Sequence, residues 1–229
     1  PDLGENIKCG NSLIGWDILE DNPNLGQEEI ERINPFDWER EFEEVFQRGG
    51  FDVVIGNPPY IRIQAMTEWA PLEVENYKRK YVSAGKGNYD IYVIFVEKGL
   101  GLLNETGRLG FILPHKFFNA KYGLPLRAIL SQGKHISEIV HFGYQQVFEG
   151  VTTYTCLLLL SKRISENFKF TKVNCLDEWK IATSTKYATV PASRAGVDEW
   201  IFVAGKEGAL LDKLRGMPLE LKDVTSRIF

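Results

Sequence analysis

Four consecutive residues, Asn57 to Tyr60, carry the clearest potential for chemistry in this sequence. The side-chain amide oxygen of Asn57 and the backbone carbonyl of Pro58 are two hydrogen-bond acceptors on a segment that prolines hold rigid. Together they could accept both hydrogens of an amino group conjugated with a ring. Such a nitrogen is a poor nucleophile because its lone pair is delocalised. Two acceptors that favour a pyramidal nitrogen would localise that lone pair and stabilise the developing positive charge, while Tyr60 offers a flat surface for stacking.

The residues before this motif predict that it follows a buried strand. Val53 to Ile55 form a short apolar run of the kind found in parallel strands that are covered on both faces. Gly56 has no side chain, so another group can approach the backbone closely. Pro58 must end the hydrogen-bond ladder because proline lacks a backbone N–H. In a parallel α/β sheet, ligands bind outside the carboxyl ends of the strands, so we expect the motif at that edge.

Helices and strands alternate after the motif. Tyr89 to Leu103 reads as an apolar helix and Arg108 to Leu113 as a second continuous apolar strand. A helix ending near Leu130 precedes a third strand, Ile136 to Phe142. A β-rich run, Val151 to Leu160, follows after a short loop and should be antiparallel to it, since a parallel crossover needs about a dozen residues or more. The alternation predicts a doubly wound, mainly parallel α/β sheet with a terminal antiparallel strand.

The segments outside this alternation have weaker patterns. Residues 6–14 read as a short strand that runs into a loop, and residues 21–36 read mostly as loop. Residues 38–46 form an amphipathic helix that Gly49 and Gly50 close. After about residue 165, small strands are expected at 168–173 and 199–203, and a short helix at 208–214.

The composition limits the possible classes of protein. The chain has 229 residues, of which 44% are hydrophobic and 12% aromatic, enough for a sizeable core. The net charge of −4 gives no support for nucleic-acid binding through bulk charge. No apolar run is long enough to span a membrane, and no secretory signal is visible. The three cysteines have no metal-like spacing, so no metal site is expected. Their odd number fits a reducing, cytoplasmic setting.

The sequence from Asn57 to Tyr60 resembles the catalytic motif of amino-class DNA methyltransferases, which modify adenine N6 with S-adenosylmethionine. The remainder resembles the methyltransferase core of large type II restriction–modification proteins. Four further segments resemble parts of the family in the family's own order. Asn6 to Leu13 resembles the strand and loop over the cofactor's adenine, and Asn88 to Lys98 resembles the helix after the catalytic loop. Gly107 to Pro114 resembles the next strand, and Val147-Phe148 with Thr152 to Lys162 resembles the motif whose aromatic covers the flipped base.

The resemblance implies roles in binding the target base. Asn57 and the carbonyl of Pro58 would bind the target amino group, with Pro59 completing the rigid motif. Tyr60 would stack on the adenine and Phe148 would pack against its opposite face or edge. The target base must leave the duplex to reach this pocket, at a cost of a few kcal/mol.

The resemblance also implies roles in binding S-adenosylmethionine. Asn11, with Ser12, would reach the adenine of the cofactor, and Phe95 would line the cofactor side. The family more often has an acidic residue at the position of Asn11. The glycine-rich turn that holds the methionine part of the cofactor is missing, as is the acidic residue that grips its ribose. Gly49-Gly50 and Gly85 to Gly87 do not follow strands and cannot replace the turn.

The missing motifs suggest a fragment with two parts. Residues 1–164 would be a partial methyltransferase catalytic domain whose first strands lie upstream. Residues 165–229 would connect it to a target-recognition domain that is absent here. The full-length protein, of a restriction–modification or phage-defence type, would bind double-stranded DNA through that domain. Without the first strands the sheet would have an exposed edge, which a dimer could cover.

Several simpler interpretations stay open. Asn57 to Tyr60 could be a strand-ending turn with a surface tyrosine, and Phe148 and Phe95 could be ordinary core residues. Asn11 and Ser12 could form a turn or a helix cap. Two other functions are also possible for the motif: a protein-glutamine methyltransferase, which uses the same four residues on a side-chain amide, and a non-catalytic interaction module that has lost cofactor binding.

Overall fold

A six-stranded sheet forms the centre of the molecule. The computed structural model describes residues 6–148, 150, 153–184 and 186–202. The strands lie in the order β1-β2-β4-β3-β5-β6. Their bounds are Phe51–Gly56 for β1, Leu103–Pro114 for β2, Ile136–His141 for β3, Thr155–Ser161 for β4, Asn167–Lys172 for β5 and Ala188–Pro191 for β6.

The strand directions confirm the predicted α/β sheet. β1 is parallel to β2, and β3 is parallel to β5, whereas the pairs β2–β4, β3–β4 and β5–β6 are antiparallel. β1, β2, β3 and β5 therefore point the same way, and β4 and β6 run against them. The predicted antiparallel pairing of β3 with β4 is confirmed. β4 lies between β2 and β3 because it turns back after β3 and enters the space beside β2.

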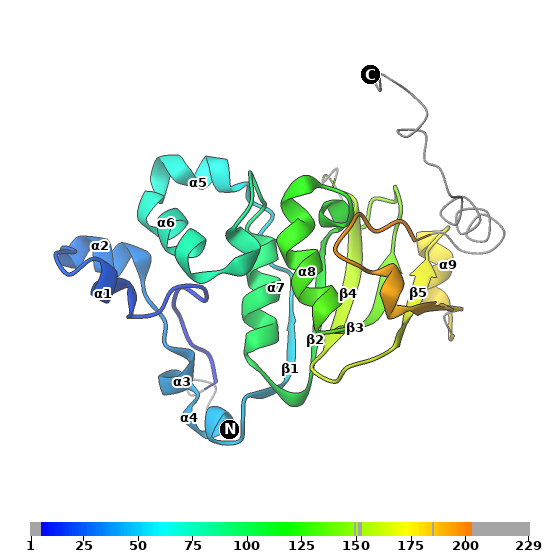
Figure 1. Ribbon diagram of the computed structural model, residues 1–229, viewed down its shortest axis with the longest axis horizontal. Helices are drawn as coiled ribbons and strands as arrows, with labels where there is room; N and C mark the ends of the chain where they lie inside the picture. The colour runs from blue at the N-terminus through cyan, green and yellow to red at the C-terminus, as the bar shows by residue number, and fades with distance from the viewer. Residues whose placement is uncertain (1–5, 149, 151–152, 185, 203–229) are drawn as a thin grey trace.

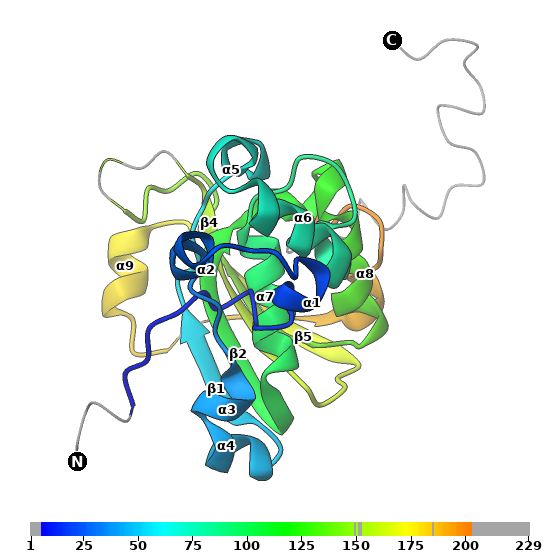
Figure 2. The same cartoon turned by 90° about the vertical axis from the view of Figure 1, so that its left-hand side faces the viewer.

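Two helices cover one face of the sheet (Figures 1 and 2): α7, Tyr92–Gly101, and α8, Leu124–Gln132. Both were predicted. α7 lies very close to β2, since a Cβ atom built on Gly99 would be only 2.7 Å from Cδ1 of Leu109. Glycine at this position allows the helix to approach the strand, and the approach fixes the helix beside the end of β1.

One helix, α9, Leu176–Ile181, lies near β5, apart from the others (Figure 1). Helices α1 to α6 form a second group, on the other side of α7. Their bounds are Ile18–Asp21 for α1, Gln27–Ile33 for α2, Trp38–Glu41 for α3, Glu43–Gln47 for α4, Ile63–Trp69 for α5 and Pro71–Lys80 for α6. The prediction of mostly loop for residues 21–36 is wrong, because α2 occupies the middle of that range. The predicted helix at 38–46 is divided at Phe42, whose ψ of 46° is not helical.

The N-terminal segment contains turns and no strand, so the short strand predicted at the start of residues 6–14 is wrong. It makes one isolated bridge, from Asn11 to Pro35. Side chains of the second helical group hold it instead: the hydroxyl of Tyr81 donates to the carbonyl oxygen of Leu13 at 2.6 Å, and the indole N–H of Trp38 donates to that of Ser12 at 3.0 Å. Tertiary contacts therefore fix this segment where ladder hydrogen bonds do not.

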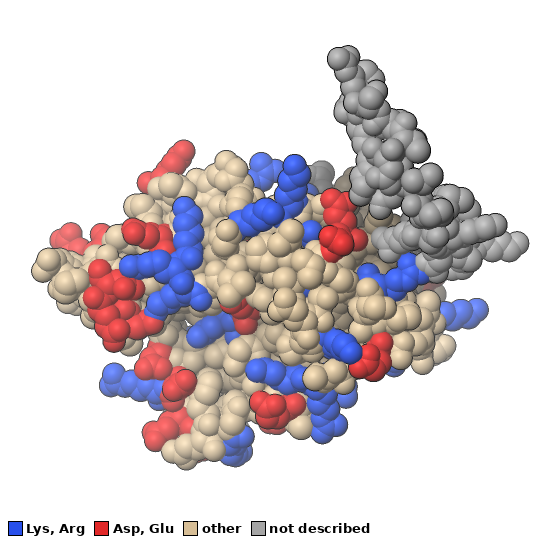
Figure 3. Space-filling model, viewed as in Figure 1, with Lys and Arg blue, Asp and Glu red and all other residues tan. Residues whose placement is uncertain are grey.

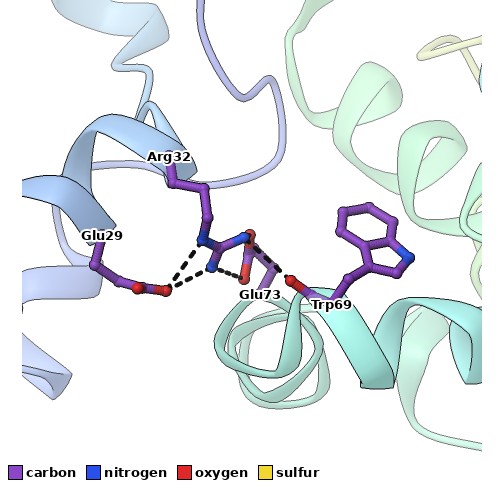
Figure 4. A network of polar contacts seen from close by, with 4 residues as sticks. All are labelled: Glu29, Arg32, Trp69 and Glu73. Atoms are coloured by element: carbon purple, nitrogen blue, oxygen red, sulfur yellow. Dashed lines mark hydrogen bonds and ion pairs between the residues drawn. The ribbon is translucent and has the colours of Figure 1, made fainter.

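A polar network joins α2 to α5 and α6 (Figure 4). The guanidinium of Arg32 donates to both carboxylate oxygens of Glu73, at 2.8 and 3.0 Å, and to Glu29 at 2.6 Å. It also donates to the carbonyl oxygen of Trp69 at 3.4 Å. The Glu73 side chain is 6% exposed and that of Arg32 is 37% exposed. Glu73 is thus a nearly buried carboxylate whose charge depends on one bidentate partner.

This network generates a prediction about stability. Glu73→Gln should lower the free energy of unfolding by roughly 1–2 kcal/mol, because it removes a charge-assisted pair and leaves Arg32 without its main partner. Urea unfolding of the two chains would measure the difference. Glu28→Gln, a change at an exposed position of α2, the helix that carries Arg32, is the control and should leave stability unchanged. Equal loss in both variants would contradict a specific role for the network.

β1 is an edge strand, and the prediction that it is covered on both faces is wrong. The side chain of Val54 is half-buried and packs against the core, but Val53 is 59% exposed and Ile55 is 79% exposed. The three residues alternate because successive side chains in a strand point to opposite faces, and α7 covers only one of those faces. Within the described residues, β1 pairs with a strand on one side only.

β5 and β6 continue the same sheet beyond residue 164. Phe168 and Phe170 of β5 are buried, and the ring of Trp200 packs against those of Phe117 and Phe118. The sheet therefore continues across residue 164, and the division into two parts at this residue stays a prediction. Residues 199–202 do not form the predicted strand, and the helix expected at 208–214 lies outside the described residues. In the part of the chain that is described, no helix is long and apolar enough to cross a membrane.

Candidate active site

The motif leaves the sheet at the carboxyl end of β1, as predicted. Gly56, the last residue of β1, is paired with Phe111 of β2. Pro58 is buried, whereas Asn57 and Pro59 are exposed. The buried proline anchors the segment and leaves the amide of Asn57 at the surface of the sheet edge.

The hydroxyl of Tyr60 is hydrogen-bonded to the side-chain oxygen of Asn57. It lies 2.6 Å from Oδ1 of Asn57 and 3.1 Å from the carbonyl oxygen of Ile112 on β2. Burial raises the pKa of Tyr60 to about 12, so the hydroxyl is a protonated donor at neutral pH. An amide oxygen has two lone pairs. An incoming amino group can therefore share Oδ1 with Tyr60 or displace its hydroxyl.

A cavity of about 230 Å³ adjoins the motif. Two of the residues predicted to bind the cofactor, Ser12 and Phe95, line it together with Asn57. The rest of the lining is mainly apolar: Trp38, Val54, Ile55, Gly56, Pro58, Pro59, Lys98, Gly99, Leu102 and Phe111. The fold thus brings residues from three distant segments to one hollow beside the amide of Asn57.

A model of the Eco57I restriction-modification methylase family matches residues 4–148. The chain belongs to this family. The matched range contains the motif, the cavity residues and the second helical group.

Proteins similar to this chain include much longer ones. A type II restriction enzyme and methyltransferase, RM.Eco57I of Escherichia coli, is 40% identical over 204 residues, which are 88% of this chain and 19% of that protein. A type II methyltransferase, M.PaeR7I of Pseudomonas aeruginosa, is 27% identical over 182 residues, 73% of this chain and 31% of that protein. The chain therefore spans less than a third of the length of either relative.

Solved structures show a weaker likeness. A complex named DrdV–DNA has a TM-score of 0.49 and 16% identity, covering 80% of this chain and 20% of that one. The type IIG restriction endonuclease BpuSI has a TM-score of 0.48 and 15% identity, covering 71% and 22%.

Asn11 does not line the cavity with Ser12. The side-chain oxygen of Asn11 accepts from the backbone N–H of Leu13 at 3.1 Å, and the backbone N–H of Asn11 donates to the carbonyl oxygen of Asn34. These contacts make the turn that directs Ser12 towards the motif. A role of Asn11 in binding the cofactor stays a prediction of the family resemblance.

Phe148 lies in the loop between β3 and β4 and is half-buried. Among the described residues it makes no ring contact with Tyr60, so its predicted place against the opposite face of a base stays a prediction. Sequence reasoning missed Trp38 and Lys98 in the cavity wall. Trp38 had the only available signal, a tryptophan on the apolar side of a short helix.

Two histidines meet at the same edge of the sheet. The rings of His115, after β2, and His141, at the end of β3, have centroids 4.3 Å apart. Burial and the neighbouring His115 lower the pKa of His141 to about 4, and burial also lowers the pKa of His115. Nδ1 of His141 accepts from the N–H of Gly143 at 3.1 Å, a bond that requires this nitrogen to be unprotonated.

This pair predicts that acid destabilises the fold. The pKa of His141 is lower in the folded chain than its ordinary value of 6.5. Between pH 6.5 and about 4, His141 is therefore protonated in the unfolded chain but not in the folded chain. The free energy of unfolding falls as the pH falls through this range. The loss is at most about 1.4 kcal/mol per pH unit for each histidine. Urea unfolding at about pH 7, 6 and 5 would measure it.

The matched variant is His141→Asn, whose amide oxygen can still accept from Gly143. It should show a shallower dependence of unfolding free energy on pH over this range. An unchanged slope would mean that His141 does not carry the effect.

Proposed function

We propose that this chain is part of the catalytic core of a DNA methyltransferase that transfers a methyl group from S-adenosylmethionine to N6 of a flipped-out adenine. The observation that carries the proposal is the position of Asn57 and Pro58 at a sheet edge beside the cavity that Ser12 and Phe95 share. The full-length protein would act in a restriction–modification or phage-defence system, as the names of its relatives suggest. A cytoplasmic location follows from a DNA substrate.

The cavity beside Asn57 fits one part of the cofactor. Its apolar wall, with Phe95 and Trp38, suits a flat or aliphatic group, and Ser12 and Lys98 are the polar side chains besides Asn57 that line it. At about 230 Å³ it is smaller than the roughly 300–1,000 Å³ of complete small-molecule sites. We infer that Ser12 and Phe95 hold a portion of the cofactor, which supplies an electrophilic methyl group when bound.

The residues of the motif would prepare the nitrogen for attack. Oδ1 of Asn57 and the carbonyl oxygen of Pro58 would each accept one hydrogen of the adenine amino group. These contacts favour a pyramidal nitrogen, whose lone pair forms the new N–C bond as the methyl group leaves sulfur. The nitrogen then loses a proton to solvent, because the motif contains no basic side chain. Tyr60 would hold the ring by stacking, an interaction worth roughly 1–3 kcal/mol per base.

The distribution of charge supports a DNA partner despite the net charge of −4. Arg79 and Lys80 of α6 pair with Asp21 and Asp17 in or next to α1. Figure 3 accordingly shows basic and acidic side chains close together over α6 and α1, whereas another group of basic side chains lies between α5 and α8. The exposed cations that follow β1 and β2, and for which the described residues show no ion pair, include Arg62, Lys86, Lys116 and Lys121. Cations at the motif's own edge are suited to phosphates.

The central test is Asn57→Ala in the full-length protein. It should lower methyl transfer to DNA by about a hundredfold or more, because a positioned acceptor is lost in the reacting geometry, while the melting temperature stays unchanged. Incorporation of labelled methyl groups into DNA would measure it. Asn119→Ala, at an exposed position after β2, is the control and should be fully active. Activity retained in Asn57→Ala would refute the role and would favour a non-catalytic module.

A second test concerns cofactor binding by this chain alone. The glycine-rich turn and the ribose-binding acid expected for the family are missing from the 229-residue sequence. We therefore expect calorimetric titration with S-adenosylmethionine to show no micromolar binding. A micromolar dissociation constant would contradict the idea that the chain holds only part of the cofactor site. The variant Val53→Lys, on the exposed face of β1, should likewise show no micromolar binding.

The proposal leaves a role for the exposed edge of the sheet. β1 has free backbone groups on one side among the described residues, and a second copy of the chain or another part of the protein could pair with it. We keep the dimer as a proposal, which sedimentation of the chain at several concentrations would test. The names of the relatives do not favour the protein-glutamine alternative.

A further inference from the structure

The ring of Tyr60 packs against the ring of a buried tyrosine, Tyr92. The ring of Tyr92, the first residue of α7, lies edge-on to that of Tyr60, with centroids 6.4 Å apart and planes at 84°. Tyr92 has no exposed surface. Its ring is therefore held by the core, and it limits the positions that the ring of Tyr60 can take.

A chain of hydrogen bonds fixes Tyr92 in turn. Its hydroxyl lies 2.9 Å from the hydroxyl of Tyr122, which lies 3.3 Å from Oδ2 of Asp90. Burial raises the pKa of Tyr122 to about 12 and that of Tyr92 well above its ordinary value, so both hydroxyls are protonated. The carboxylate of Asp90 can only accept. Tyr122 therefore donates to Asp90, and Tyr92 donates to Tyr122.

The same segment also holds the backbone that follows Tyr60. Asp90 forms an isolated antiparallel bridge with Arg62. The N–H of Ile63 donates to the carbonyl of Tyr89 at 2.9 Å, and the N–H of Ile91 donates to that of Ile61 at 2.8 Å. The residues on either side of Asp90 are thus bonded to the residues immediately after the motif, so Asp90 is fixed relative to Tyr60 through both backbone and side chains.

We propose that Asp90, Tyr122 and Tyr92 form a positioning chain that sets the ring of Tyr60 for stacking on the target base. The proposal rests on the methyltransferase function proposed above. None of the three residues is catalytic, because their effect passes through Tyr60. The sequence does not indicate this positioning chain, since Tyr122 comes from a 3₁₀ turn, Lys121–Gly123, that lies far from the motif along the sequence.

The test uses kcat and KM of the full-length protein for DNA methylation. Tyr122→Phe keeps the ring and removes only the hydroxyl. It should lower kcat about fivefold, the effect of one typical hydrogen bond, while KM for DNA and the melting temperature change little. Asp90→Asn, which weakens the same chain, should act in the same direction. Tyr144→Phe is the matched control, because Tyr144 is 84% exposed on the loop after β3, and it should match the wild type.

Two double-variant cycles separate positioning from general stability. Tyr92→Phe removes the donor of the bond to Tyr122, so adding it to Tyr122→Phe should cause little further loss. In a Tyr60→Leu background, Tyr122→Phe should have no further effect on the single-turnover rate, because the ring that the chain positions is absent. A merely structural role would instead give the same fractional loss in both backgrounds.

The outcomes distinguish the inference from the function on which it rests. A wild-type protein that transfers no methyl group to adenine would overturn both. An active wild type in which Tyr122→Phe and Asp90→Asn keep full kcat, or in which Tyr122→Phe lowers the rate equally with and without Tyr60, would overturn the positioning chain alone.

Discussion

The pairing of β1 with β2 is the constraint on which the candidate site depends. It sets Gly56 opposite Phe111, so the chain leaves the ladder one residue before Asn57. The next carbonyl along β2, that of Ile112, then receives the hydroxyl of Tyr60. This bond can form because β2 continues to Pro114, beyond the level at which β1 ends. α7 can support this pair closely because Gly99 allows it to approach β2.

The sheet and the motif could be predicted because their signals are local. A continuous apolar run identifies β2, and the shortness of the loop between β3 and β4 determines that these two strands are antiparallel. Prolines and a glycine mark the end of β1. The motif Asn57 to Tyr60 is a recognisable order of residue types that follows a strand, so general rules on parallel sheets predict the edge at which it lies.

Other parts of the structure depend on contacts that the sequence does not reveal. α2 lies in a polar stretch bounded by Asn-Pro pairs, and the network of Arg32 with Glu73 stabilises its packing on α6. The N-terminal segment reads as a strand, but its partners are side chains such as Tyr81 rather than another strand. Val53 and Ile55 read as buried because an apolar run does not indicate whether both faces of a strand are covered.

The hydrogen bond from Tyr60 to Asn57 has a consequence for turnover. In the proposed reaction, unmodified adenine offers two N–H donors to the acceptors of the motif, whereas the methylated product offers one. The product therefore loses one of its two bonds at the moment the reaction ends. The hydroxyl of Tyr60 stands 2.6 Å from Oδ1 of Asn57 and can take the vacated place. The same tyrosine that receives the substrate would then favour release of the product, and rebinding of an already methylated site would be disfavoured.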